Sequence, residues 1–120
     1  MKAILIDPTK LDVTEVNIGT DYREIYKQID ADIFECITIN KNGDAIYIDE
    51  EGLLKSFETQ CFFMFSGYPQ PIAGKGLILG LNRATGESEN PTITVKEVIQ
   101  KVSYLTPYQV YLWTLENEDN

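Results

Sequence analysis

Residues 33–48, IFECITINKNGDAIYI, hold the clearest fold signal in this 120-residue sequence. Segments 33–39 and 45–48 are rich in β-branched and aromatic residues, which favours a strand on each side of the polar stretch 40–44. Asn42-Gly43 tolerates the positive φ angles of a type I′ turn, a tight connection between antiparallel strands. The stretch therefore predicts a β-hairpin.

The residues before this hairpin predict another hairpin followed by a helix. Residues 2–6 form a short apolar run that ends at the turn dipeptide Asp7-Pro8, and residues 11–18 follow as the partner strand. Thr20 or Asp21 can cap a helix, because either side-chain oxygen accepts hydrogen bonds from the first free backbone amides. The apolar face of this helix repeats at i, i+3, i+4 and i+7 and consists of Tyr22, Ile25, Tyr26 and Ile29.

The residues after the central hairpin predict two buried segments and a second helix. Residues 61–65 are an apolar aromatic run, 66–71 a loop because it contains two prolines, and 77–79 a buried strand. A polar loop spans 82–90, and a capping box of Thr94 and Glu97 then begins the helix. Its apolar residues again repeat at i, i+3, i+4 and i+7: Val95, Val98, Ile99 and Val102.

The end of the chain predicts a last strand and a tail. Thr106-Pro107 is expected to stop the second helix, because proline cannot continue one. Alternating aromatic residues predict a strand over 108–115, and residues 116–120 form a frayed acidic tail. We therefore expect a single α+β domain over 1–115, built as one mostly antiparallel sheet of hairpins with two amphipathic helices packed on it.

Composition excludes several kinds of protein. The sequence contains no histidine, which removes the commonest general base and most transition-metal sites. Cys36 and Cys61 are too few and too far apart for a disulfide framework or a zinc site, and we expect both to be inert buried thiols. No apolar run is long enough to cross a bilayer and no secretion signal is visible, so we expect a cytoplasmic protein.

Two stretches resemble a calcium loop and a phosphate-binding glycine loop, but neither matches its motif. Asn40, Asn42, Asp44 and Glu51 occupy positions 1, 3, 5 and 12 of a calcium-loop template, but Ala45 stands where that loop requires glycine. We therefore expect no metal site and a solvated acidic turn instead. The segment 74–80 contains three glycines, but its spacing and its place before a strand do not fit a dinucleotide fingerprint or a P-loop.

A window without carboxylates is harder to dismiss. Residues 59–86 contain no Asp or Glu and carry a charge of +2, while the rest of the chain carries −11. Core positions explain part of the pattern, but not the loops 66–76 and 82–86. Cations, backbone amides and aromatic faces together bind phosphates and bases. We expect a pocket for a small anionic, nucleotide-type ligand here, lined by Tyr68, Gln70, Gly74, Lys75, Gly76, Asn82, Arg83 and Thr85.

Four stretches also carry a family resemblance. They are MKAILIDP at 1–8, YREIY at 22–26, GD at 43–44 with IYIDEEG at 46–52, and IAGKGLILG at 72–80. In that order they resemble the DUF3846 family of small proteins, common in bacteriophages and other mobile elements. The resemblance extends from Met1 to about Val102, with one departure: residues 57–66 lack a Leu-Pro-x-Asn-type run common among members. It brings no catalytic residues and implies an accessory protein working in the cytoplasm of a bacterial host.

Three functions remain open at this point. The leading hypothesis is a non-enzymatic counter-defence protein that sequesters a nucleotide-type ligand without a cofactor: Lys75 and Arg83 neutralise phosphate, the Gly74 and Gly76 amides donate to it, and Tyr68 stacks on a base. The alternative is an acidic inhibitor or DNA mimic that blocks a basic host protein. This is favoured by a net charge of −9, of which −7 lies in residues 1–60.

A metal-dependent enzyme using Asp and Glu is the third class. The negative charge argues against direct binding to nucleic acid, and we expect no membrane partner. Two small helices need not cover both faces of a sheet, so a homo-oligomer that uses the final aromatic segment is compatible with the sequence.

Overall fold

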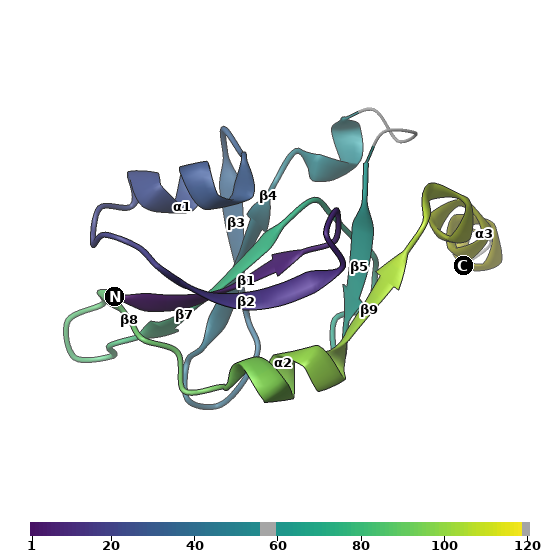
Figure 1. The fold of residues 1–120 in the computed structure, drawn as a ribbon. Coiled ribbons are helices and arrows are strands. Elements are labelled where there is room, and N and C mark those ends of the chain that lie inside the picture. Colours follow the sequence, from purple (N-terminus) through teal and green to yellow (C-terminus); the bar gives the residue numbers. More distant parts are fainter. Residues whose placement is uncertain (56–59, 119–120) are drawn as a thin grey trace.

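The fold combines two antiparallel sheets with helices. The computed structural model describes residues 1–55 and 60–118 (Figure 1). The main sheet has the order β2-β1-β7-β4-β3, with a short strand β8 beside β7, and the second sheet has the order β6-β5-β9. The α+β class is confirmed, but the expectation of a single sheet is wrong, because segment 62–65 pairs with residues 102–105 instead of joining the main sheet.

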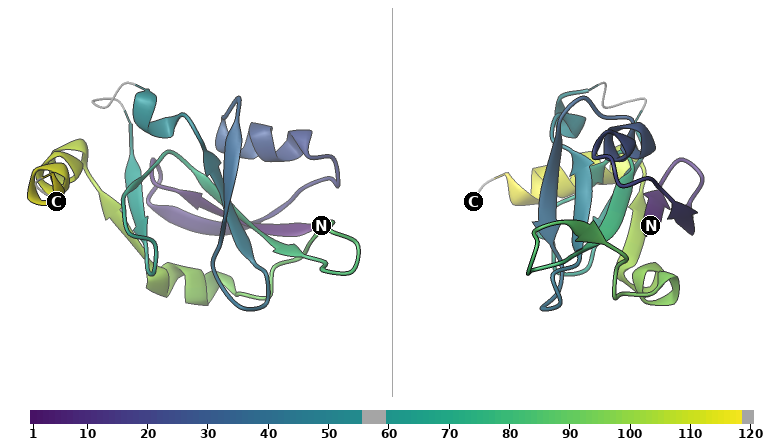
Figure 2. Two further views of the ribbon diagram at one scale, coloured as in Figure 1. Left: turned by 180° about the vertical axis from the view of Figure 1, so that it is seen from behind. Right: turned by 90° about the vertical axis from the view of Figure 1, so that its left-hand side faces the viewer.

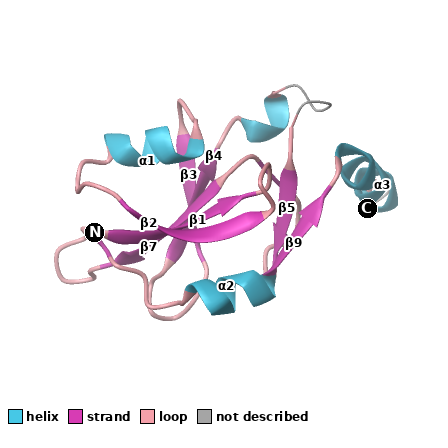
Figure 3. Ribbon diagram, viewed as in Figure 1, coloured by secondary structure: helices cyan, strands magenta, loops and turns pink. Residues whose placement is uncertain are grey.

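Figure 3 shows the helices and strands of the described residues by colour. The strands of the main sheet are β1 (Lys2–Asp7), β2 (Asp12–Asn17), β3 (Phe34–Thr38), β4 (Ala45–Asp49), β7 (Gly76–Leu81) and β8 (Ser88–Glu89). Those of the second sheet are β5 (Phe62–Phe65), β6 (Ile72–Ala73) and β9 (Val102–Leu105). The helices are α1 (Arg23–Ile29), the 3-10 turn η1 (Gly52–Leu54), α2 (Val95–Lys101) and α3 (Pro107–Asn117).

Both predicted hairpins form, and β7 joins them. Strands β1 and β2 pair along their whole length, as do β3 and β4. The buried strand predicted at 77–79 lies between the hairpins, where Gly76 faces Ile6 of β1 on one side and Ile48 of β4 on the other. The hairpins therefore meet only through β7 in the sheet order.

The turn of the central hairpin differs from the type I′ prediction. The last paired residues are Thr38 and Ala45, so the connection is longer than two residues. Gly43 has a positive φ of 93°, but Asn42 does not adopt that conformation. The side chain of Asn40 organises the loop instead, because its Oδ1 accepts hydrogen bonds from the backbone amides of Asn42 and Asp44. Asparagine often folds a loop this way through its own side chain.

The two faces of the main sheet are covered by different elements. Because side chains alternate along a strand, one face presents a set of residues that includes Ile4, Ile46 and Ile78. The second sheet and Val98 of α2 pack on this face. The opposite face packs against Ile25 and Ile29 of α1. Figure 1 shows α1 and α2 on opposite sides of the main sheet.

The signals that begin these helices are only partly as predicted. The capping box of Thr94 and Glu97 is present at α2. At α1 the residue in the cap position is Tyr22, whose side chain makes no capping bond. Asp21 lies one residue earlier and accepts a hydrogen bond from the Arg23 amide at 3.0 Å.

The last part of the chain corrects the sequence prediction most strongly. Residues 108–115 form helix α3, not a strand. Thr106-Pro107 begins this helix, because Thr106 forms a capping box with Gln109 and proline fits the first helical turn. Helix α2 ends earlier, at Lys101, where the chain continues as β9. Glu116 and Asn117 lie in the final turn of α3, and residues 119–120 of the predicted tail lie outside the described residues.

Candidate functional site

The residues predicted to form one anion pocket lie in two groups. Tyr68, Gln70, Gly74 and Lys75 precede β7, while Asn82, Arg83 and Thr85 follow it. Strand β7 has six residues, and at about 3.3 Å per residue its length of roughly 20 Å separates the two groups. A single phosphate cannot contact both Lys75 and Arg83 across this distance, so the predicted pocket does not form.

The groups meant to bind the anion already have partners within the protein. The Gly74 amide donates to the Cys61 carbonyl at 2.9 Å, and Lys75 pairs with Asp30 at 2.8 Å. Gly76 lies within the sheet between two paired strands. Arg83 donates from Nη2 to the Lys41 carbonyl.

The remaining predicted residues are similarly placed. Asn82 Oδ1 accepts from the amides of Ala84 and Thr85, while Thr85 Oγ1 accepts from the Glu87 amide, so these two side chains hold their own loop. Gln70 donates to the Tyr68 hydroxyl at 3.3 Å. Tyr68 and Gln70 line a small hollow of about 30 Å³ that is also lined by the acidic residues Glu35, Asp49 and Glu50. Three carboxylates around one hollow disfavour an anion.

These carboxylates belong to a larger acidic edge of the main sheet. Strand pairing brings together the end of β1, the start of β2, the start of β3 and the end of β4. This acidic edge consists of Asp7, Asp12, Asp30, Asp32, Glu35, Asp49, Glu50 and Glu51. Lys10, Lys55 and Lys75 lie on the same edge, which leaves five negative charges in excess.

The acidic edge affects its lysines. A hydrogen bond to Asp49, at 2.5 Å, raises the pKa of Lys55, and the charges of Asp32 and Glu51 add to the effect. A hydrogen bond to Asp30 likewise raises the pKa of Lys75, with a further contribution from Asp7. Both lysines therefore stay protonated at neutral pH and serve this edge, not a bound anion.

Asp44 has a role that the sequence did not reveal. We expected a solvated acidic turn, but Asp44 is completely buried. Its carboxylate accepts hydrogen bonds from the Asn40 side chain at 2.9 Å, the Thr92 amide at 2.9 Å, the Thr92 hydroxyl at 2.7 Å and the Ile93 amide at 2.8 Å. Burial alone would raise the pKa of Asp44, but these hydrogen bonds outweigh it and lower the pKa below its usual value.

Asp44 thereby fixes the segment before α2 against the central hairpin. Asn42 adds a hydrogen bond to the Thr92 hydroxyl at 3.1 Å. At the start of the segment, the side chain of Asn90 accepts from the Lys2 amide at 2.8 Å. Residues 90–94 are therefore held at both ends, to β1 and to the hairpin.

A pocket of about 530 Å³ lies between this fixed segment and β1. We call it the α2 pocket; it is lined by Lys2, Ala3, Ile4, Glu15, Asn90, Pro91, Thr92, Ile93, Thr94, Val95 and Lys96. Its lining combines apolar residues with two lysines, Lys2 and Lys96, against one acidic residue, Glu15. Within residues 1–55 and 60–118, neither lysine forms an ion pair.

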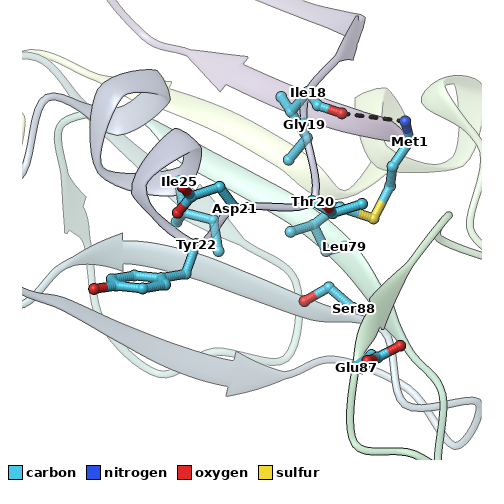
Figure 4. Close-up of a pocket in the computed structure, with 10 residues that line it drawn as sticks. All are labelled: Met1, Ile18, Gly19, Thr20, Asp21, Tyr22, Ile25, Leu79, Glu87 and Ser88. Carbon is cyan, nitrogen blue, oxygen red and sulfur yellow. Dashed lines mark hydrogen bonds between the residues drawn. The ribbon is translucent and has the colours of Figure 1, made fainter.

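A second pocket, of about 480 Å³, lies on the other face of the sheet beside α1. Figure 4 shows Asp21 and Tyr22 from the start of α1, with Glu87 and Ser88 across the opening. The Met1 ammonium group points toward the Ile18 carbonyl, to which it donates at 3.1 Å. With two carboxylates against one ammonium group, this α1 pocket suits an anion less well than the α2 pocket.

The sequence model of one family, described as a domain of unknown function, DUF3846, matches residues 1–103. This chain belongs to the DUF3846 family. The resemblance carried by the four sequence stretches is thus confirmed. Neither the curated proteins nor the solved structures contain a match to it.

The match places both pockets, the acidic edge and the Asp44 network within the DUF3846 region, whereas α3 follows it. The pocket residues Lys2 and Lys96 could not be found from the sequence, because they lie on a strand and a helix that are far apart in the chain. The one sequence feature that could have indicated this pocket is segment 90–94. It has the features of a helix start, and in the structure it also forms the pocket wall.

We expected both cysteines of this DUF3846 chain to be buried, but neither is fully buried. Cys36 is exposed and Cys61 is partly exposed. Desolvation by its neighbours nevertheless raises the pKa of the Cys36 thiol, more than a hydrogen bond with Tyr47 lowers it. The thiolate, which is the reactive form, is therefore disfavoured at neutral pH.

Metal-binding clusters and membrane-spanning helices are both absent from the described residues. Among the described residues, no three His, Cys, Asp or Glu side chains lie close enough to hold a metal ion together. No helix in that same part of the chain is both long and apolar enough to cross a membrane.

Proposed function

We propose that this DUF3846 protein is a non-enzymatic accessory protein of a phage or mobile element that sequesters a small anionic, nucleotide-type ligand. The α2 pocket is the site that supports this function best. The observation that carries the proposal is that Lys2 and Lys96 line a partly apolar pocket and that neither forms an ion pair with a described residue.

The size and chemistry of the α2 pocket fit such a ligand. Its volume of about 530 Å³ lies within the range of small-molecule sites, roughly 300–1,000 Å³. Ile93 and Val95, which are partly exposed, offer an apolar surface for a base, and the lysines can neutralise a phosphate. Asn90 accepts from the Lys2 amide through Oδ1, which leaves its Nδ2 group to donate to the ligand.

The rigidity of the pocket wall also supports binding. The hydrogen bonds to Asp44 fix Thr92 and Ile93 before any ligand arrives. A preorganised wall reduces the entropy lost on binding, so more of the contact energy contributes to affinity. Tight capture without turnover needs such a wall, but it needs no catalytic group.

Thermal melting against mono-, di- and cyclic nucleotides, at low and high salt, tests the proposal. A ligand that binds only the folded protein raises the melting midpoint by mass action. We expect the nucleotide class that binds to raise the melting midpoint of the wild type but not that of Lys2→Ala/Lys96→Ala. The midpoint of Lys10→Ala/Lys41→Ala, a control that removes equal charge from exposed loops, should still rise. A shift that instead requires Lys75 and Arg83 would refute the α2 pocket.

The acidic edge favours a second candidate function, inhibition of a basic host protein or DNA mimicry. Asp7 and Asp49 are buried, but the other acids of this edge lie at the surface at one end of the sheet, where they could replace DNA phosphates on a partner. Pull-down from bacterial lysate over a salt gradient should then recover basic proteins at low salt only. Glu35→Lys/Glu50→Lys should abolish recovery, while Glu87→Lys/Glu89→Lys, which changes two exposed acids at the opposite end of the sheet, should not.

A further inference from the structure

Helix α3 stands apart from the rest of the molecule. Figures 1 and 2 show it beyond β9, at one end of the structure and away from the main sheet. Val110 is its one buried residue among those described, and it packs with Phe62, Ala73 and Leu105. The rest of the helix has little of the protein to pack against.

The outward side of α3 carries an apolar stripe. Tyr108, Tyr111, Leu112 and Leu115 repeat at i, i+3, i+4 and i+7, so they share one side of the helix. They are 69%, 47%, 39% and 48% exposed, respectively. This α3 stripe has the spacing by which helices pack on one another.

The helix is strongly specified despite this exposure. Thr106 and Gln109 form a complete capping box, and Pro107 occupies the first turn. An isolated helix of 11 residues is marginal in water, so packing of the apolar stripe would add the missing stability.

We infer that α3 is a homodimer interface in which a second copy of this chain packs its own α3 antiparallel on the first. The charges of the helix favour this occupant. Residues 107–117 contain no lysine or arginine, and their one carboxylate, Glu116, lies at the C-terminal end with Glu118 just after it. Antiparallel packing places these acids beside the positive N-terminal end of the partner's helix, whereas parallel packing places acid against acid.

The size of the α3 stripe sets the strength of the dimer. Its four side chains expose roughly 400 Å² per copy, given about 200 Å² for a tyrosine. Two copies would bury roughly 800 Å², below the usual 1,200–2,000 Å² of stable complexes. We therefore expect a dimer that dissociates in the micromolar range. Because each copy carries −9, salt should strengthen it by screening the repulsion.

Sedimentation equilibrium of the full chain from 5 to about 500 µM, in low and high salt, tests this inference. We expect a monomer–dimer equilibrium that Leu112→Glu/Leu115→Glu weakens at least tenfold, with the far-UV circular dichroism spectrum unchanged. Ile99→Glu is the matched control, because Ile99 is 55% exposed on α2, outside the stripe, and this variant should dimerise normally.

Two results would overturn the inference. One is a wild-type chain that stays monomeric over the whole range in both salt conditions. The other is a dimer with the same dissociation constant in the wild type and the Leu112→Glu/Leu115→Glu variant. If that variant fails to fold, Tyr108→Ser/Tyr111→Ser provides the same comparison without adding charge.

Discussion

Replacement of Asp44 with alanine is expected to lower the free energy of unfolding by about 3–5 kcal/mol. Four donors point at this buried carboxylate, from Asn40, Thr92 and Ile93, at 2.7–2.9 Å. Each hydrogen bond to a charged group contributes roughly 1.5–3 kcal/mol. Thr92 is exposed, so water can replace its two bonds. The bonds to Asn40 and Ile93 together contribute about 3–6 kcal/mol. Both residues are partly exposed, which reduces this to the expected range.

The effect should be large in a melting experiment. For a chain of this size, 1 kcal/mol moves the melting midpoint by roughly 3–5 °C, so Asp44→Ala should melt roughly 9–25 °C below the wild type. Urea unfolding followed by far-UV circular dichroism measures the loss directly. Asp32→Ala is the control, because Asp32 is an exposed acid on the acidic edge.

The same residue should shape the acid stability of the protein. The hydrogen bonds lower the pKa of Asp44 in the folded state below its unfolded value near 3.8. Its contribution is therefore fully present above that unfolded pKa and is lost as the pH falls through the lower, folded pKa. Asp44→Ala should lose less stability than the wild type over that acid range. A loss below 1 kcal/mol at pH 7, equal to that of Asp32→Ala, would refute the role assigned to Asp44.

Three further substitutions probe other parts of the fold. Gly80→Ala should lower the unfolding free energy by about 2 kcal/mol or more in urea titrations, because its Cβ would lie 2.4 Å from the Asn90 carbonyl oxygen. An unfolding free energy equal to that of the wild type would show that the backbone at Asn90 can move away at little energetic cost. Thr106→Ala should weaken α3 by about 1 kcal/mol, seen as faster amide exchange over 107–117, with the global midpoint almost unchanged. Equal protection in both proteins would contradict the cap. Lys75→Ala should change stability by less than about 1 kcal/mol in the same titration, because Asp30 is 71% exposed; a larger loss would mean a buried role for the pair.

The parts of the fold that the sequence predicted correctly are those with local signals. The hairpins, the 3.6-residue periodicity of α1, the capping box of α2 and the apolar run of β7 each lie within a few neighbouring residues. The second sheet was missed, because pairing of β5 with β9 joins residues about 40 positions apart, and periodicity carries no information on such pairing.

Helix α3 was missed for a different reason. A Thr-Pro dipeptide such as Thr106-Pro107 is compatible with the end of one helix or with the start of another. The aromatic residues after it fit both the alternating pattern of a strand and the spacing of a helix. The capping partner Gln109, three residues after Thr106, was the signal that could have decided between them.

The candidate site was the least predictable part. A carboxylate-free window is a property of the linear chain, but β7 carries its two halves to opposite ends of the sheet. Asp44 looked like any other acid of a polar turn, because its donors at Thr92 and Ile93 lie 48 and 49 residues away. Burial that depends on such distant partners cannot be predicted from the neighbouring residues in the sequence.

The place of β7 between the two hairpins has a consequence for synthesis of the chain. On the ribosome, both hairpins emerge before residue 76, yet the inner edges of β1 and β4 have no partner until β7 follows. During that interval the nascent chain exposes two open strand edges, which can pair with other chains. Closure of the sheet therefore depends on contacts of high sequence separation, which form slowly. Slow translation between residues 50 and 76 would lengthen this interval, and aggregation during synthesis would increase with it.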